Sequence, residues 1–519
     1  MESLATLSGR SVAELQAAFD TFPYMQAALA FGWALFAFEM YLSLRQHQRY
    51  VAALRPHAQS IDALVPKVLR GIVKEELFER TQSYNKDRSQ LDMLRNAYSQ
   101  IEMTAILLLG FLPWCWSWSG RAITQDLLRY DSAAEHPIVH SVAFVWVFSV
   151  LSFVTTLPWS AYATFVVEEK HGFNRQSVGF FIVDKIKQLV LTIVLIPVVV
   201  GPLVFLIQWG GEQFYFYVWF FMLAFSVLML TIYPVVIAPM FDKYVPLPDG
   251  ELLSRIQSLA QHPDIQFPLV KIFVVLASKR SSHSNAYFYG FFKNKRIVLF
   301  DTLLGDEYNL DSSAAALDAG LHGHSHNSHH DHGHSHDGDN HGHSHDSDNH
   351  GHSHDEQQPA RKKRVTEPCT VPEILAVLAH ELGHWKLNHT LKNFVFSQFM
   401  NFVSFALFSL FVSYQPLYTS FGFPDSRPVF IGMFLVFQFV FQPMNTVLQF
   451  LMTVLSRRYE FQADAFAAKL GHGGHLRTAL VKLQKNNLSD MDPDPLYSMY
   501  HYSHPPLVER LNAIGGKED

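Results

Sequence analysis

The stretch HELGH, residues 380–384, holds three side chains whose types and spacing suit a metal site and its base. His380 and His384 are four residues apart, so on a helix both imidazoles lie on one face and can reach one metal ion. Glu381 lies at the edge of that face, where a carboxylate can take a proton from metal-bound water. This HExxH pattern predicts hydrolysis assisted by one zinc ion per subunit.

A zinc hydrolase needs a third protein ligand, and the stretch RRYEFQADAFAAKLG, residues 457–471, can supply one. Glu460 and Asp464 share a helical face, and such a pair alone is often only a solvated surface. Joined to HExxH, the pair predicts Glu460 as the third ligand and Asp464 as the carboxylate that orients a ligating imidazole. His389 follows His384 by five residues, not by the six of HExxHxxGxxH, and is interpreted as structural.

The composition of the chain indicates a membrane protein. Of its 519 residues, 49% are hydrophobic and only 17% are charged, and 44 are Phe. A span needs about 20 apolar residues, and hydropathy predicts seven spans near 25–44, 103–122, 139–167, 179–208, 214–240, 393–420 and 429–455. The net charge of −6 gives no basic surface for nucleic acid, and two cysteines make no disulfide framework.

Lysine and arginine gather on one side of the predicted spans. Only Arg10 precedes the first span, whereas seven basic residues lie between Arg45 and Arg80. Because basic loops stay in the cytosol, the N-terminus is predicted to be lumenal. The loop 241–392 and the tail from residue 456 are then both cytosolic.

A histidine-rich insertion occupies residues 319–357 of that loop. It contains three near-copies of a nine-residue unit, beginning at His332, His341 and His350, and half of the chain's 28 histidines. The repeat holds no apolar residue that could bury a core, so disorder is expected. The insertion could carry extra zinc, or it could be drifted low-complexity sequence; the residues leave both readings open.

Three motifs together resemble the type 1 CAAX prenyl proteases, the farnesylated-protein-converting zinc metalloendopeptidases. They are HELGHWKLNHT, RRYEFQADAFAAKLG and MYHYSHPPLVERL, and the resemblance continues in residues 167–176, 237–252 and 284–304. It covers nearly the whole chain, although the histidine-rich insertion is not part of the family pattern.

The resemblance implies roles for individual residues. His380, His384 and Glu460 would bind zinc, Glu381 would be the base, and His504 would steady the oxyanion with the substrate-binding residue Arg510 nearby. Asn285 and Ala286 would belong to an edge strand that pairs with the substrate backbone. From the residues alone, the choice between His501 and His504 stays open.

The resemblance also implies a fold, a reaction and a location. The expected fold is mainly α-helical, with seven transmembrane helices around a chamber and a zincin-like cytosolic domain containing a small β-sheet. The expected regions are a membrane region 1–240 with five spans, the catalytic loop 241–392, spans six and seven in 393–455, and a catalytic segment 456–519. The stretch 270–304 is predicted to form two strands joined by a turn around Gly290 and Asn294.

The implied substrates are membrane-held prenylated CAAX proteins, which lose their last three residues; some family members make a second, upstream cut. The implied location is the endoplasmic reticulum membrane, with the inner nuclear membrane as a further site. The alternative is a zinc transporter with a cytosolic histidine-rich loop. Transporters need ionisable ligands in the middle of their spans, and here these spans hold few such residues.

Overall fold

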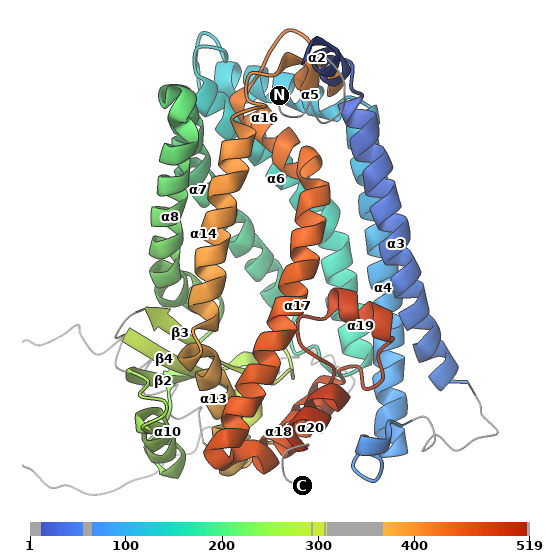
Figure 1. The fold of residues 1–519 in the computed structure, drawn as a ribbon, viewed down its shortest axis with the longest axis vertical. Coiled ribbons are helices and arrows are strands. Elements are labelled where there is room, and N and C mark those ends of the chain that lie inside the picture. Colours follow the sequence, from blue (N-terminus) through green and yellow to red (C-terminus); the bar gives the residue numbers. More distant parts are fainter. Residues whose placement is uncertain (1–11, 56–64, 292–293, 306–307, 309–366, 516–519) are drawn as a thin grey trace, which may run out of the picture.

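Long helices run between the two ends of the molecule (Figure 1). The computed structural model describes residues 12–55, 65–291, 294–305, 308 and 367–515. The long helices are α3 (Tyr24–Ala53), α4 (Glu75–Leu108), α6 (Pro137–Tyr162), α7 (Val178–Trp209), α8 (Phe214–Ile232), α14 (His389–Phe408) and α17 (Gln442–Ala467). A mainly helical membrane protein with a small sheet, as predicted, is confirmed.

The described residues contain four unbroken helices that are long and apolar enough to cross a membrane: Tyr24–Ala53, Pro137–Glu168, Val178–Trp209 and Gly211–Phe241. Two bent pairs, Glu75–Leu108 with Phe111–Leu127 and Val429–Val440 with Gln442–Asn487, would raise the number to six. The predicted span at 393–420 corresponds to α14, which is not among these helices. The number of seven spans therefore stays a prediction.

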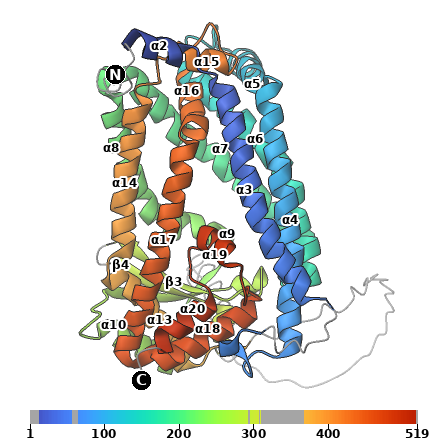
Figure 2. The same ribbon diagram turned by 45° about the vertical axis from the view of Figure 1, so that its right-hand side comes forward.

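The bend between α4 and α5 (Phe111–Ser119) has a local cause. Gly110 adopts a left-handed conformation with φ 65°, which a residue without Cβ reaches at no steric cost. The two helices meet there at 70°. The chain thus turns across the upper end of the molecule, which Figure 2 shows with α2 (Val12–Asp20) and α15 (Gln415–Ser420) nearby.

A hydrophobic core closes this upper end. It joins α5, α6, α7, α8, α14, α15 and α16 (Val429–Leu435), and its largest fully buried side chain is Tyr418. The Tyr418 hydroxyl donates a hydrogen bond to the backbone oxygen of Val412, so this buried polar group is satisfied. The upper end therefore holds the tops of the long helices together.

A four-stranded mixed sheet lies at the lower end (Figure 1). Its order is β1 (Tyr244–Pro246), β2 (Leu269–Val275), β4 (Asn294–Phe300) and β3 (Ala286–Phe291), so β3 is an edge strand. The predicted pair of strands corresponds to the antiparallel hairpin β3–β4. The structure adds β2, which pairs with β4 in parallel, and the short strand β1.

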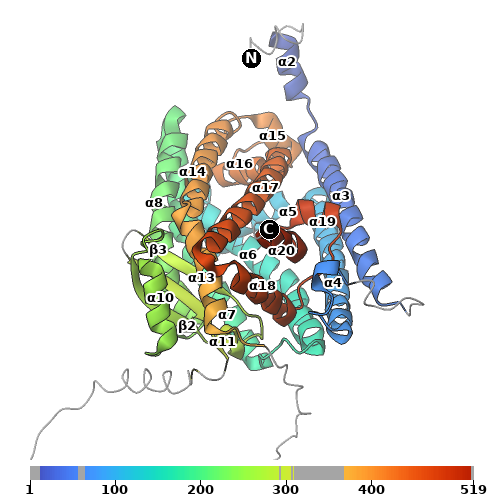
Figure 3. The same cartoon turned by 60° about the horizontal axis from the view of Figure 1, so that its bottom comes forward.

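One hydrophobic core joins the loop after α8 to the C-terminal tail. It contains residues of the sheet, α10 (Glu251–Gln261), α11 (Asp301–Leu304), α13 (Val371–Lys386), α18 (Gly473–Asn487) and α20 (Leu507–Gly515). Seen from the lower end in Figure 3, α13, α17 and α18 lie between α8 and the α3–α4 pair. The two segments predicted to be catalytic therefore fold as one unit, while the predicted region boundaries stay a prediction.

Further short helices in the described chain include α9 (Ala238–Phe241), which follows α8, and α19 (Pro495–His501), which packs against α3. The histidine-rich insertion 319–357 lies outside the described residues. The described chain comes together on either side of it, where the backbone N–H of Cys369 donates to the oxygen of Leu303 at 3.0 Å.

Candidate metal centre and active site

Helix α13 carries the HExxH residues on a well-fixed backbone. Thr370 and Glu373 form a capping box at its start, with the Thr370 N–H donating to the Glu373 carboxylate at 2.8 Å. Most of the helix is buried, against α17, α18 and α10. It ends before Asn388, whose left-handed φ of 58° redirects the chain into α14.

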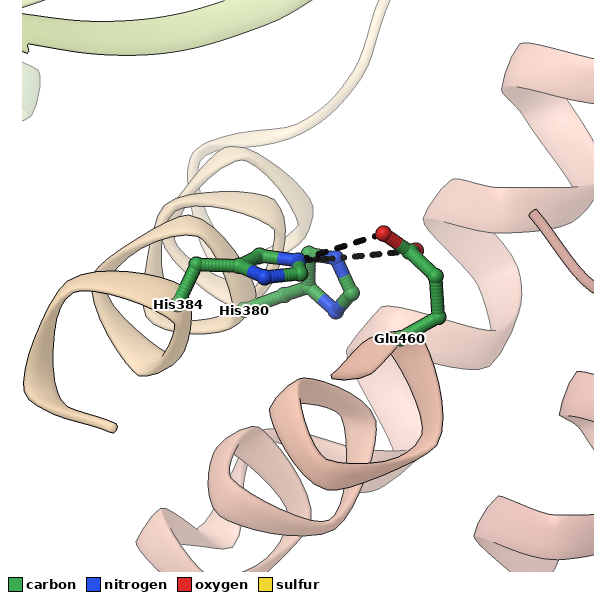
Figure 4. A group of neighbouring side chains, drawn as sticks. All are labelled: His380, His384 and Glu460. Carbon is green, nitrogen blue, oxygen red and sulfur yellow. Dashed lines mark hydrogen bonds and ion pairs between the residues drawn. The ribbon is translucent and has the colours of Figure 1, made fainter. Parts of the chain in front are cut away.

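The three predicted metal ligands lie together (Figure 4). His380 Nε2 and His384 Nε2 are 3.2 Å apart, and they lie 3.4 and 3.3 Å from the Glu460 oxygens Oε2 and Oε1. Zinc with bonds of about 2.0–2.1 Å to four tetrahedral ligands separates neighbouring ligand atoms by about 3.3 Å. The donor set and its spacing therefore fit a zinc ion with one position left for water.

Asp464 supports His380 from behind. Its Oδ1 lies 2.8 Å from His380 Nδ1, so Nδ1–H can donate to the carboxylate and Nε2 keeps its lone pair for a metal. Arg510 of α20 donates two hydrogen bonds to the same carboxylate, from Nε at 2.8 Å and from Nη2 at 2.7 Å. Burial opposes ionisation, but Arg510 and His380 hold the pKa of Asp464 below its usual range.

A second support chain, which sequence reasoning missed, stands behind His384. His384 Nδ1 lies 3.0 Å from His389 Nδ1, and His389 Nε2 lies 2.9 Å from the amide oxygen of Gln462. Burial lowers the pKa of His389 to about 4, so its ring is neutral and can accept from His384. His389, interpreted as structural, thus orients a candidate ligand. No local pattern signals this role, because it depends on the turn at Asn388.

The charges around the site favour a bound cation. Burial alone would raise the pKa of Glu460, but the neighbouring side chains of His380, His384 and His504 hold it well below its usual range. Glu460 Oε2 is buried without a hydrogen bond of good geometry. Two buried carboxylates, Glu460 and Asp464, face one guanidinium, that of Arg510. A divalent cation would balance this surplus of negative charge.

Glu381 lines the same cavity as His384, Glu460 and His504. Burial raises the pKa of its carboxyl group, whereas the neighbouring imidazoles act in the opposite direction. A raised pKa makes a carboxylate a better proton acceptor near neutral pH. Glu381 is thus placed where a base could serve water bound at the His–His–Glu group.

The structure places His504, but not His501, in contact with Glu460. The sequence alone had not decided between these two histidines. His504 Nδ1 lies 2.9 Å from Glu460 Oε2, and its side chain is 67% exposed. His501 instead packs on Tyr497, with ring centroids 4.4 Å apart. Arg510, predicted near the substrate, lies behind Glu460 in contact with both carboxylates. Its contact with substrate stays a prediction.

Asn285 and Ala286 lie at the start of the edge strand β3. The Asn285 side-chain oxygen accepts from the Ala286 N–H at 2.8 Å, and its backbone oxygen accepts from Phe300. Asn487, at the end of α18, makes two hydrogen bonds to the backbone of Ser284, at 2.9 and 3.2 Å. This clasp, which the sequence did not reveal, fixes the strand relative to the metal-binding helices.

The arrangement has relatives among known proteins. A family model described as "CAAX prenyl protease N-terminal, five membrane helices" matches residues 55–243, and one described as "Peptidase family M48" matches residues 246–518. The CAAX prenyl protease 1 homolog of Homo sapiens is 44% identical over 488 residues, which cover 94% of each chain. That of Arabidopsis thaliana is 41% identical over 96% of this chain and 98% of the relative.

A more distant relative and a solved structure agree. The CAAX prenyl protease 1 of Saccharomyces cerevisiae is 34% identical over 95% of each chain. The crystal structure of Ste24p from S. mikatae superposes with a TM-score of 0.76 at 32% identity, covering 95% of this chain and 100% of that one. The likeness therefore extends over both the membrane helices and the lower end.

Proposed function

The chain belongs to the CAAX prenyl protease family of M48 peptidases, and we propose that it removes the last three residues of prenylated CAAX proteins. The observation that carries the proposal is the His380–His384–Glu460 group beside Glu381 and the edge strand β3. Family membership makes it a multi-pass membrane metallopeptidase. Zinc, the substrate and the residue roles are proposed.

We infer zinc, one ion per subunit, from two imidazoles and a carboxylate spaced as tetrahedral ligands. When bound, zinc would lower the pKa of a water toward about 7 and polarise the scissile carbonyl. His380 and His384 would each present Nε2, held by Asp464 and His389 behind them. A further zinc could lie on the histidine-rich insertion, outside the described residues.

Glu381 would accept the proton of the attacking water and pass it to the leaving amine. His504 would donate a ring N–H to the oxygen on which negative charge develops. The substrate backbone would pair with β3 beside Asn285 and Ala286, because the outer edge of this strand has no partner strand in the described sheet. Each role thus falls to a side chain or edge next to the His–His–Glu group.

A cavity of about 890 Å³ next to Glu381 suits the prenyl group. Aromatic side chains of β3 (Tyr287, Phe288 and Tyr289) line it together with Met229 and Leu230 of α8. A lipid placed there would be removed from water, which favours binding. The substrate would therefore be held at the membrane by its lipid and at β3 by its backbone.

We propose the endoplasmic reticulum membrane as the location, with the inner nuclear membrane as a further site. The N-terminus would be lumenal and the catalytic segments cytosolic. Support comes from the basic residues after the first span and from Figure 1, where the sheet, α13, α18 and α20 share the end opposite α2. The two segments proposed to be catalytic would therefore lie on the same side of the membrane.

The zinc-transporter alternative is not supported. The matching families are peptidases, and the candidate ligands lie on α13 and near the end of α17 rather than in the middle of a span. A second, upstream cut of the substrate remains a proposal, and a longer prenylated substrate would reveal it as a second product.

The proposed function is tested with purified protein and a farnesylated CAAX peptide. The wild type should release the C-terminal tripeptide, and Glu381→Gln should keep its zinc yet release the tripeptide about 10²–10⁴-fold more slowly, because the base is lost. The matched control is Glu251→Gln, an exposed glutamate at the start of α10, which should behave as wild type. Removal of metal by a chelator should stop release, and zinc should restore it.

Two results would contradict the proposal. Tripeptide release by Glu381→Gln at the wild-type rate would exclude this base. Zinc flux through wild-type protein in sealed vesicles, with no peptide cleaved, would favour transport instead.

A further inference from the structure

Two cavities of different character meet at His504. The apolar cavity, described above, contains Glu381 and the aromatic side chains of β3. The second, of about 700 Å³, is lined by polar side chains of α4 and by the segment that leads from α18 to His504. We call it the polar cavity. His504 lines both, so the His–His–Glu group lies where a bound peptide could extend into each.

The direction of β3 relates the two cavities to the two ends of a substrate. His283, just before β3, lines the polar cavity, whereas Tyr287 and Tyr289 line the apolar cavity. A peptide paired antiparallel with β3 therefore runs from the apolar into the polar cavity. A peptide bound in the opposite direction would place its prenyl group among polar side chains, so the free energy gained by burying the lipid in an apolar cavity would be lost. The released residues then occupy the polar cavity.

The polar cavity contains paired cations where the peptide would end. Arg88 and Arg95 are seven residues apart on α4, which places them on one helical face. Their side chains are 61% and 53% exposed, so their guanidinium groups are accessible. Asp92 lies between them, 4.0 Å from Arg88 Nε and 3.2 Å from Arg95 Nη2.

The charge balance of this face favours an anion. Two guanidinium groups share the single carboxylate of Asp92. The other carboxylate that lines the cavity, Asp490, is buried and already accepts from Gln46 and Tyr50. The Tyr84 hydroxyl, which lines the cavity, hydrogen-bonds to Arg88, and Glu168, which does not line it, also acts on Arg88. Guanidinium groups bind carboxylates through charge-assisted hydrogen bonds, and the C-terminus of a peptide carries a carboxylate.

We propose that Arg88 and Arg95 bind the free C-terminal carboxylate of the substrate, so that the cleaved bond is chosen by its distance from the chain end. An extended tripeptide spans about 10 Å, and His504 lines the same cavity as both arginines. This inference rests on the proposed function and names a substrate-binding site within it.

The test compares two farnesylated CAAX peptides that differ only at the C-terminus, one with a free carboxylate and one with a carboxamide. Wild-type protein should cleave the acid with a kcat/KM about tenfold or more above that of the amide, since a charge-assisted contact is lost. The difference should lie mainly in KM. The double variant Arg88→Ala/Arg95→Ala should cleave the acid peptide with the kcat/KM of the amide peptide. Its kcat/KM for the amide peptide should equal that of wild type.

Controls separate this inference from other failures. Lys86→Ala removes a cation from the same helix but outside the polar cavity, and should keep the acid preference. Equal cleavage of both peptides by wild type would overturn the carboxylate site and leave the proposed function standing. Cleavage of neither would overturn both. An equal loss on both peptides in the arginine variant would show a structural role and contradict the inference. The comparison of acid and amide peptides with wild-type protein tests the inference even if the arginine variant fails to fold.

Discussion

His380 and His384 differ in what stands behind them. His380 is backed by the carboxylate of Asp464, whereas His384 is backed by the neutral ring of His389. A carboxylate partner raises the basicity of a ligating imidazole more than a neutral one does. The two ligands should therefore respond unequally to loss of their partners.

At residue scale we predict that Asp464→Asn weakens zinc binding about 10–100-fold. An amide cannot serve both Arg510 and His380 as the carboxylate does, because its nitrogen would face a guanidinium donor. Zinc affinity measured by competition with a chelator checks the prediction. Asp425→Asn, an exposed aspartate at the far end, is the matched control. An unchanged affinity would show that the carboxylate charge is dispensable.

The sequence predicted the residues whose chemistry is local. HExxH and the Glu460–Asp464 pair each lie within a few residues on one helix, so helical spacing alone places their side chains. His389 and Gln462 escaped prediction because they meet only after the turn at Asn388 brings α14 beside α17. Such a contact depends on packing between segments that are far apart in sequence.

The elements are joined by polar contacts as well as by hydrophobic cores. We predict that Asn487→Ala, which removes both hydrogen bonds to Ser284, raises the KM for a CAAX peptide more than it lowers kcat. The edge strand would lose its fixed start, at a cost of about 1–3 kcal/mol in stability. Peptide kinetics together with thermal unfolding check this.

Asn487→Asp is the graded control for that variant. It keeps an acceptor for the Ser284 N–H but loses the donor to the Ser284 oxygen, so its effect should be intermediate. A KM equal to wild type in both variants would show that the clasp does not position the strand.

A second set of polar contacts links α3 to the segment that carries His504. Asp490 accepts from Gln46 at 2.7 Å and Tyr50 at 2.9 Å, both on α3, and from Tyr502 at 3.3 Å. Burial raises the pKa of Asp490 to about 6, although these hydrogen bonds act in the opposite direction. The folded protein thus holds a proton there that the unfolded chain releases near pH 4.

The sign of the resulting pH dependence follows. Between pH 4 and 6 the unfolded chain binds fewer protons at Asp490, so this group's contribution to stability falls as pH rises, by roughly 3 kcal/mol in total. Asp490→Asn should remove this slope, so the unfolding temperature of the variant should rise relative to that of wild type as pH increases from 4 to 6. Thermal unfolding across this range measures the gain. A difference that does not change with pH would contradict the assignment.

Element prediction succeeded where a pattern is continuous along the chain. Apolar runs placed most of the long helices, and strand-forming residues around a turn placed the β3–β4 hairpin. The predicted span 103–122 was wrong, because α4 begins at Glu75 and the bend at Gly110 divides that stretch. The 70° bend at Gly110 and strand β1 were not predicted. The bend depends on one backbone conformation, and β1 is three residues long and gains its stability from β2.

At the scale of the whole molecule, we predict that deleting residues 320–356 leaves peptidase activity and unfolding temperature close to wild type when zinc is plentiful. Leu303 and Cys369, described residues on either side of this segment, are hydrogen-bonded to each other, and loop length costs only about 0.6 kcal/mol per doubling. Activity and metal content of the shortened protein check this. Complete loss of activity at normal metal content would show a direct role in catalysis.

The overall arrangement could be predicted only in outline. The resemblance of motifs indicated one site built from distant segments, and the core shared by the loop and the tail agrees with it. That α4 faces the α18–α19 segment across a polar cavity could not be predicted. The lining of that cavity comes from residues about 400 positions apart, and no local pattern relates them.

The placement of Glu460 and His504 late in the chain bears on how the protein is made. A ribosome completes α13, with both imidazoles, before it starts α17, so a growing chain holds two of the three candidate metal ligands and lacks the carboxylate of Glu460. Tight capture of the ion must await translation of the final helices. A chain still being translated therefore lacks part of the candidate metal site, and the proposed hydrolysis can begin only after α17 has been made.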